Sequence, residues 1–74
     1  MAVSVLELPA RALTPRERDV LRPASNGLPN KSIAFELNLG VETVRTHMAL
    51  VISKLDAVNR TGAVAKALRM TLIE

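Results

Sequence analysis

The chain has 74 residues, with ten Lys and Arg against seven Asp and Glu, one His and no Cys. A chain this short forms one small domain with little stability to spare, which excludes a multidomain enzyme and a large catalytic cleft beside the core. The absence of Cys excludes disulfides, thiol catalysis and Cys-ligated metals, and it suits a reducing compartment.

Hydrophobic residues make up 49% of the chain, yet Phe35 is its only aromatic residue. The core must therefore be aliphatic, and this composition suits packed helices. No apolar run approaches the roughly 18 residues that a membrane span needs, and the first residues lack the pattern of a signal peptide. We therefore expect an unexported, cytoplasmic protein that makes no membrane contact.

The formal charge of +3 favours an acidic partner. The excess is evenly spread, however, with +1 in each of residues 1–29, 30–60 and 61–74. A basic balance permits a nucleic-acid partner, but only the placement of charges on helical faces can identify one.

The sequence divides into a short lead segment and one domain. Residues 1–12 show no sustained period and contain Pro9, which disfavours a helix, so we interpret them as a tail or the stub of a linker. Residues 13–74 carry the helical patterns and are predicted to form the folded domain.

A first helix is predicted over residues 15–25. Thr14 and Glu17 have the spacing of a capping box, in which each side chain accepts a hydrogen bond from the other residue's backbone amide. Gly27 supplies a stop signal at the other end. Pro23 conflicts with a regular helix, because it removes one backbone donor, and predicts a kink or an early end.

A second helix is predicted to begin at Asn30, interpreted as its N-cap, and to end where Asn38-Leu39-Gly40 interrupts the pattern. Gly40 is the predicted cap of a third helix, so the connection between the two helices is very short. Two short helices joined so tightly indicate a helix-turn-helix, in which the turn forces a steep crossing.

The third helix is predicted over residues 41–55 and is the most informative segment. At 100° per residue, its apolar side chains form a narrow seam, made of Val44, Met48, Val51 and Leu55. His47 and Ile52 flank that seam. The opposite face is small and polar, and it consists of Glu42, Arg45, Thr46, Ala49 and Ser53.

A last helix is predicted to begin at Asn59-Arg60, with Asn59 as its cap. Gly62 in the first turn weakens this helix. Its apolar residues recur at steps of three and four, at Ala63, Val64, Ala67 and Leu68.

Catalytic chemistry is poorly supported by these residues. The carboxylates lie in separate elements, and neither a glycine-rich phosphate loop nor a metal-ligand spacing is present in the sequence. We therefore expect no enzymatic activity, no cofactor and no metal. His47 is interpreted as half-buried beside the seam, with a phosphate contact as the alternative, and Phe35 as a cover for the edge of the core.

From Leu13 to Ala65, the runs LTPRERDVL, GLPNKSIAFEL, TVRTH, KL, NR and AV resemble the LuxR/GerE/FixJ-type DNA-binding domain of bacterial transcription regulators. The run GLPNKSIA is most similar to the FixJ-type output domains of two-component response regulators. This resemblance implies an all-α, compact four-helix domain that contains a helix-turn-helix. Its third helix would enter the major groove of DNA. Its second helix would support the third and lie across the DNA backbone, and its fourth would form a dimer contact.

The resemblance also implies which residues contact double-stranded DNA. Arg45 is the first candidate for a base contact, because Arg pairs bidentately with O6 and N7 of guanine, and Thr46 is the second. The predicted base contacts are Arg45, Thr46, Ala49 and Glu42. The predicted phosphate contacts are Asn30, Lys31, Thr43, His47 and Lys54. An ion pair with a carboxylate such as Glu17 is an equal alternative for Lys54.

A homodimer on paired half-sites is predicted, because one copy with few phosphate contacts would bind weakly. Ala63 and Ala67 are the predicted dimer contacts, and ordinary core packing of both residues is the alternative. RNA polymerase is a further candidate partner of such a regulator.

Two other functions remain open at this point. A promoter-recognition region of a sigma factor shares the patterns LT..E..VL and IA..L..TV. A helical protein-interaction module that has lost DNA binding is supported by Ala49, Leu50 and Val58, which stand where many family members carry polar or basic residues.

Overall fold

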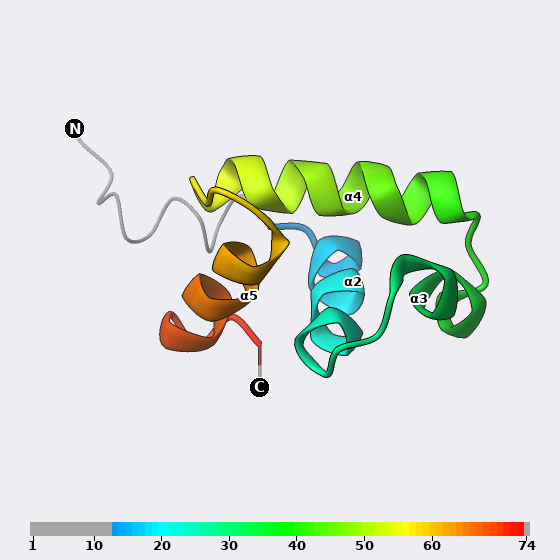
Figure 1. The fold of residues 1–74 in the computed structure, drawn as a ribbon, viewed down its shortest axis with the longest axis horizontal. Helices are drawn as coiled ribbons and strands as arrows, with labels where there is room; N and C mark the ends of the chain where they lie inside the picture. Colours follow the sequence, from blue (N-terminus) through cyan, green and yellow to red (C-terminus); the bar gives the residue numbers. More distant parts are fainter. Residues whose placement is uncertain (1–12, 74) are drawn as a thin grey trace.

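The computed structural model describes residues 13–73, and this part of the chain contains four helices and no strand. In chain order they are α2 (Pro15–Ser25), α3 (Asn30–Leu37), α4 (Val41–Lys54) and α5 (Arg60–Arg69). The long helix α4 lies across one side of the domain. The other three helices, α2, α3 and α5, all pack against the same side of α4 (Figure 1). The predicted four-helix, all-α fold is therefore confirmed, while the predicted tail 1–12 lies outside the described residues.

Helix α2 begins at the predicted capping box. The backbone amide of Thr14 donates to Oε1 of Glu17 at 2.9 Å, and the amide of Glu17 donates to Oγ1 of Thr14 at 3.1 Å. Both interactions satisfy amides that the helix itself leaves without a partner, which explains why α2 begins where the spacing predicted.

Of the two outcomes expected at Pro23, the early end is wrong, since α2 continues to Ser25, while the kink stays a prediction. The φ of proline is compatible with a helix, so α2 continues past Pro23 although the bond from residue 23 to the carbonyl of Asp19 is missing. The carbonyl of Pro23 itself accepts from the amides of Asn26 and Leu28, at 3.0 and 3.2 Å. Gly27, with φ of 87°, then turns the chain away as predicted.

All four helices end in the same type of turn. A residue with positive φ is followed by an amide that donates to a carbonyl five positions earlier, an arrangement known as the Schellman motif. The positive-φ residues are Gly27, Asn38, Asp56 and Thr71. Glycine adopts this conformation without cost, whereas a β-branched residue such as Thr71 is strained there.

The second helix differs from the prediction at its first residue. Pro29 is the N-cap of α3 and makes no side-chain cap, while Asn30 is already helical. The interpretation of Asn30 as N-cap is therefore wrong. Its side chain is engaged by a residue of α5, as described below. The predicted break at residues 38–40 is confirmed, and Gly40 is the N-cap of α4.

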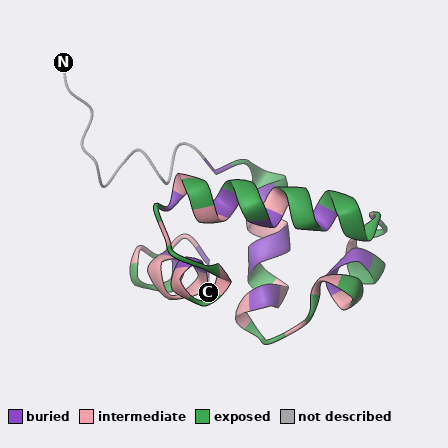
Figure 2. Ribbon diagram, turned by 45° about the horizontal axis from the view of Figure 1, so that its top comes forward, coloured by how far each residue is buried: buried purple, intermediate pink, exposed green. Residues whose placement is uncertain are grey.

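The core lies between α4 and the other three helices, and the buried positions of α4 face inward (Figure 2). All four seam residues predicted for this helix, Val44, Met48, Val51 and Leu55, are at most 5% exposed. Phe35 was expected to cover the core edge, but it is 88% exposed, so that interpretation is wrong. Only Ile33 and Ala34 of the short helix α3 are buried, and Phe35 lies on its opposite side.

None of the helices in residues 13–73 is long and apolar enough to cross a membrane. Those residues also contain no group of three or more His, Cys, Asp and Glu side chains placed to hold a metal ion.

Candidate nucleic-acid interface

The outward face of α4 carries the residues predicted to contact bases. Glu42, Arg45, Thr46 and Ala49 are all exposed, and by helical spacing they lie on the side opposite the buried seam. The 3.6-residue period of the helix causes this separation, since the apolar positions recur at steps of three and four and turn inward together. The result is a mostly small and polar outer surface on a helix whose other side packs on the core.

Arg45 and Glu42 form an ion pair on this face, with Nη1 of Arg45 donating to Oε2 of Glu42. The two side chains are 61% and 82% exposed, respectively. An exposed pair of this kind is worth about 1 kcal/mol or less, so a nucleic-acid base could replace Glu42 as the acceptor. Thr46 donates its hydroxyl proton to the backbone carbonyl of Glu42 at 3.0 Å, which leaves its oxygen as an acceptor.

Two of the predicted phosphate contacts lie in first turns of helices and are exposed. Lys31 is the second residue of α3, and Thr43 is the third residue of α4. Backbone amides without an intrahelical partner gather at these positions, and the helix dipole favours an anion there. Lys31 adds a full positive charge to the start of α3.

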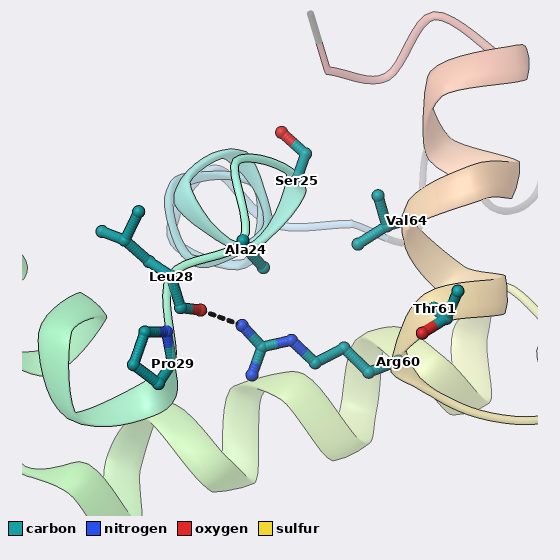
Figure 3. A pocket seen from close by; sticks show the side chains of 8 residues that line it. Ala24, Ser25, Leu28, Pro29, Arg60, Thr61 and Val64 are labelled. Atoms are coloured by element: carbon teal, nitrogen blue, oxygen red, sulfur yellow. Dashed lines mark hydrogen bonds between the residues drawn. The ribbon is translucent and has the colours of Figure 1, made fainter.

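The side chain of Asn30 is held by Arg60, a residue that the sequence analysis did not single out. Nη1 of Arg60 donates to Oδ1 of Asn30 at 2.8 Å, and Nη2 donates to the carbonyl of Leu28. Figure 3 shows Arg60 extending from α5 to the loop before α3. A pocket of about 340 Å³ lies between this loop, the end of α2 and α5. The one signal for Arg60 in the sequence was its place in the NR run.

Lys54 does not face the same surface as Arg45. Its Nζ donates to both carboxylate oxygens of Glu17, at 2.9 and 3.0 Å, and the Glu17 side chain is 3% exposed. The ion pair, one of the two predicted alternatives, is therefore confirmed. A nearly buried carboxylate thus holds the ammonium group of Lys54 against α2, and the phosphate contact of Lys54 stays a prediction.

The carboxylate of Glu17 caps the start of α2 and also forms the ion pair with Lys54. Burial raises the pKa of Glu17, but the hydrogen bond from the Thr14 amide, the bonded charge of Lys54 and the nearby His47 together outweigh it, so the pKa lies below its ordinary value of 4.5. Glu17 is thus an ionised group inside the fold and takes no part in the outer face of α4.

His47 is half-buried beside the seam of α4, as predicted. Its Nδ1 is buried and has no hydrogen-bond partner among the described residues. The phosphate contact predicted for His47 would have to use its other ring nitrogen, Nε2.

Ala63 and Ala67, the predicted dimer contacts, follow the alternative prediction of ordinary core packing. Both residues are completely buried in the core of the single chain, so they offer no surface to a second copy. They fill the space between α5 and the helices that it contacts, α4 and α2. Leu68, which is 46% exposed, is the large apolar residue that α5 does present to solvent.

The fold and the exposed face of α4 define a helix-turn-helix DNA-binding domain. Residues 11–67 match the model of the family described as bacterial regulatory proteins, luxR family. A solved structure of the transcription factor GerE superimposes with a TM-score of 0.80 at 31% identity, over 84% of this chain and 92% of that one. The chain therefore belongs to the LuxR family of bacterial regulatory proteins.

Curated relatives agree with this assignment. The chain is 41% identical over 66 residues to the transcriptional regulatory protein LiaR of Bacillus subtilis. This match covers 89% of the chain and 31% of LiaR. It is 43% identical over 51 residues to the nitrate/nitrite response regulator protein NarL of Escherichia coli, covering 69% of this chain and 24% of NarL. The chain thus spans about a third or less of these regulators. The family is one of transcription regulators, not of enzymes, and the match favours it over the sigma-factor-like alternative.

Proposed function

We propose that this domain binds double-stranded DNA sequence-specifically as the output domain of a bacterial transcription regulator, acting in the cytoplasm at the nucleoid. The observation that carries the proposal is the outer face of α4, where Glu42, Arg45, Thr46 and Ala49 stand exposed opposite a buried seam. A helix of this kind fits the major groove, which displays a distinct pattern of donors and acceptors for each base pair.

Each exposed residue suits a particular contact. Arg45 would donate to O6 and N7 of guanine, and Thr46 would meet a thymine methyl group. Ala49 is small enough to let the helix lie deep in the groove. Glu42 would either accept from N4 of cytosine or keep its hold on the guanidinium of Arg45.

Phosphate contacts would position the helix without reading sequence. Lys31, Thr43 and His47 are the proposed contacts, together with Asn30 at the first helical position of α3. A single domain with about four such contacts would bind weakly and would be sensitive to salt.

A homodimer on paired half-sites would overcome this weakness. We place its contact on the exposed side of α5, where Thr61, Ala65 and Leu68 follow one another at helical spacing. Leu68 supplies the apolar contact, because it is 46% exposed in the single chain. RNA polymerase is a further proposed partner, as expected of a transcription regulator.

Selection from a random duplex library with the wild-type domain tests the proposal. Sequence-specific binding predicts enrichment of a short motif that contains a guanine essential for affinity. Recovery of no motif, or retention of all sequences equally at every salt concentration, would contradict it.

A helical interaction module is the second candidate, and it has an observation of its own. Phe35 and Val58 are 88% and 95% exposed, so two large apolar side chains are open to a protein partner. The same selection decides between the two functions, because an interaction module would recover no motif.

A further inference from the structure

The guanidinium of Arg60 links the last helix to the start of the helix-turn-helix. One nitrogen donates to Oδ1 of Asn30 at 2.8 Å, and another donates to the carbonyl of Leu28, so a single rigid group holds two points of the segment that opens α3 (Figure 3). Arg60 is the first residue of α5, and Asn30 lies 30 positions earlier in the sequence.

Within the helix-turn-helix, this segment is held by the amide of Leu28, which donates to the carbonyl of Pro23 at 3.2 Å, and by the packing of Leu28 against the core. Pro29, the N-cap, donates no backbone hydrogen bond and makes no side-chain cap, and Asn30 is the first helical residue. The planar fork of arginine fixes both distance and direction, whereas the ammonium of a lysine reaches one acceptor with little directional control. The position of residues 28–31 is therefore set from α5 as well as from within the helix-turn-helix.

We propose that Arg60 is a positioning residue for DNA backbone recognition. It holds residues 28–31 so that the amides at the start of α3 and the charge of Lys31 meet a phosphate while α4 lies in the groove. The inference rests on the proposed function. Through Arg60, α5 would also help to orient α3, and α5 is the helix on which we place the dimer contact.

Arg60→Lys separates this positioning role from the charge of the residue, because it keeps the charge and removes the fork. The probe is the duplex selected from the random library, and its binding is followed by fluorescence anisotropy across a series of KCl concentrations. We expect Arg60→Lys and Arg60→Ala to bind about three- to tenfold more weakly. The salt slope, which is the fall of log K with the logarithm of the salt concentration, should be lower by about 0.9 for each phosphate that the domain no longer neutralises. The preference among sequences should stay unchanged, since phosphate contacts carry no sequence information.

Lys66→Met is the matched control. Lys66 is also on α5, and its Nζ donates to the carbonyls of Leu55 and Asp56, at 3.0 and 2.9 Å, without contacting α3. Its loss removes a charge and two hydrogen bonds from the same helix, so it should lower stability while leaving the salt slope unchanged. In ¹H–¹⁵N spectra of the free domain, Arg60→Lys should shift the amides of Asn30 and Lys31, and Lys66→Met should shift those near Asp56.

Folded fractions measured under the binding conditions keep the test independent of stability. If Arg60→Ala does not fold, Arg60→Lys and Arg60→Gln carry the comparison. The inference is overturned if the folded variants bind with the affinity and slope of the wild type, or if Lys66→Met changes the slope as much as they do. A wild-type domain that binds no duplex would overturn the proposed function and this inference with it.

Discussion

Glu17 and Lys54 lie 37 positions apart in the sequence, and Nζ of Lys54 donates to both carboxylate oxygens of Glu17, at 2.9 and 3.0 Å. The same carboxylate accepts from the amide of Thr14 at 2.9 Å. One side chain therefore joins the start of α2 to the last turn of α4. This fixes the far end of α4, whose outer face we propose to read DNA.

Lys54→Met should destabilise the domain strongly, because it leaves the buried charge of Glu17 with only its cap interactions. Removing one partner of a buried ion pair costs about 3–5 kcal/mol, and the partial exposure of Lys54 puts the expected loss at about 2–3 kcal/mol. Urea unfolding at neutral pH measures this loss. Lys31→Met, which removes an exposed charge, is the control, and an equal loss for both variants would show that the pair contributes nothing specific.

Acid should weaken the domain through Glu17. Its pKa lies below the ordinary value of 4.5, so the folded state binds fewer protons than the unfolded state around that pH. The stability that Glu17 contributes is therefore complete above pH 4.5 and is lost as the pH falls through the folded-state pKa. Urea midpoints measured from pH 7 to pH 3 should fall less steeply for Glu17→Gln than for the wild type. Parallel curves would contradict this assignment.

The local patterns predicted the helices well because their causes are local. A capping box needs two residues three positions apart, and the seam of α4 follows from helical spacing alone, so Thr14, Glu17 and Val44 could be placed without a structure. The split of exposed from buried residues on α4 follows from the same spacing. The helix-turn-helix was therefore predicted correctly.

The contacts between distant segments could not be predicted in this way. Arg60 meets Asn30 only because α5 folds back beside the loop before α3, and no periodicity reports that arrangement. On α5, apolar residues spread over a wide stripe, so spacing alone could not decide whether Ala63 faces the core or a second copy. Phe35 was expected to cover the edge of the core, but it lies on the side of α3 opposite the buried Ile33 and Ala34, and its hydrophobic character alone could not reveal that.

Thr71→Gly should stabilise the domain. Thr71 has φ of 59°, a conformation that costs a β-branched residue roughly 1–2 kcal/mol. Glycine removes that strain but loses more entropy on folding, so the net gain should be about 0.5–1 kcal/mol. Thermal unfolding measures it, with Thr61→Gly inside α5 as the control that should destabilise. A lower melting temperature for Thr71→Gly would contradict the assigned strain.

Leu68→Glu tests the dimer contact proposed on α5. Two copies that meet through exposed apolar side chains should be separated by opposed negative charges. We expect the variant to bind a duplex with one half-site as tightly as the wild type does, but to lose cooperativity on a duplex with two half-sites. Unchanged cooperativity on paired sites would place the contact elsewhere.

A comparison of Arg45→Ala with Lys31→Ala separates the reading of bases by α4 from the contact between the start of α3 and the DNA backbone. Both variants are titrated against the selected duplex and all its single-base substitutions at two salt concentrations. We predict that Arg45→Ala costs about 1–3 kcal/mol and relaxes specificity at one position, whereas Lys31→Ala weakens binding to all sequences alike and lowers the salt slope by about one. If Arg45→Ala left every base preference intact, Arg45 on α4 would not be the residue that reads a base.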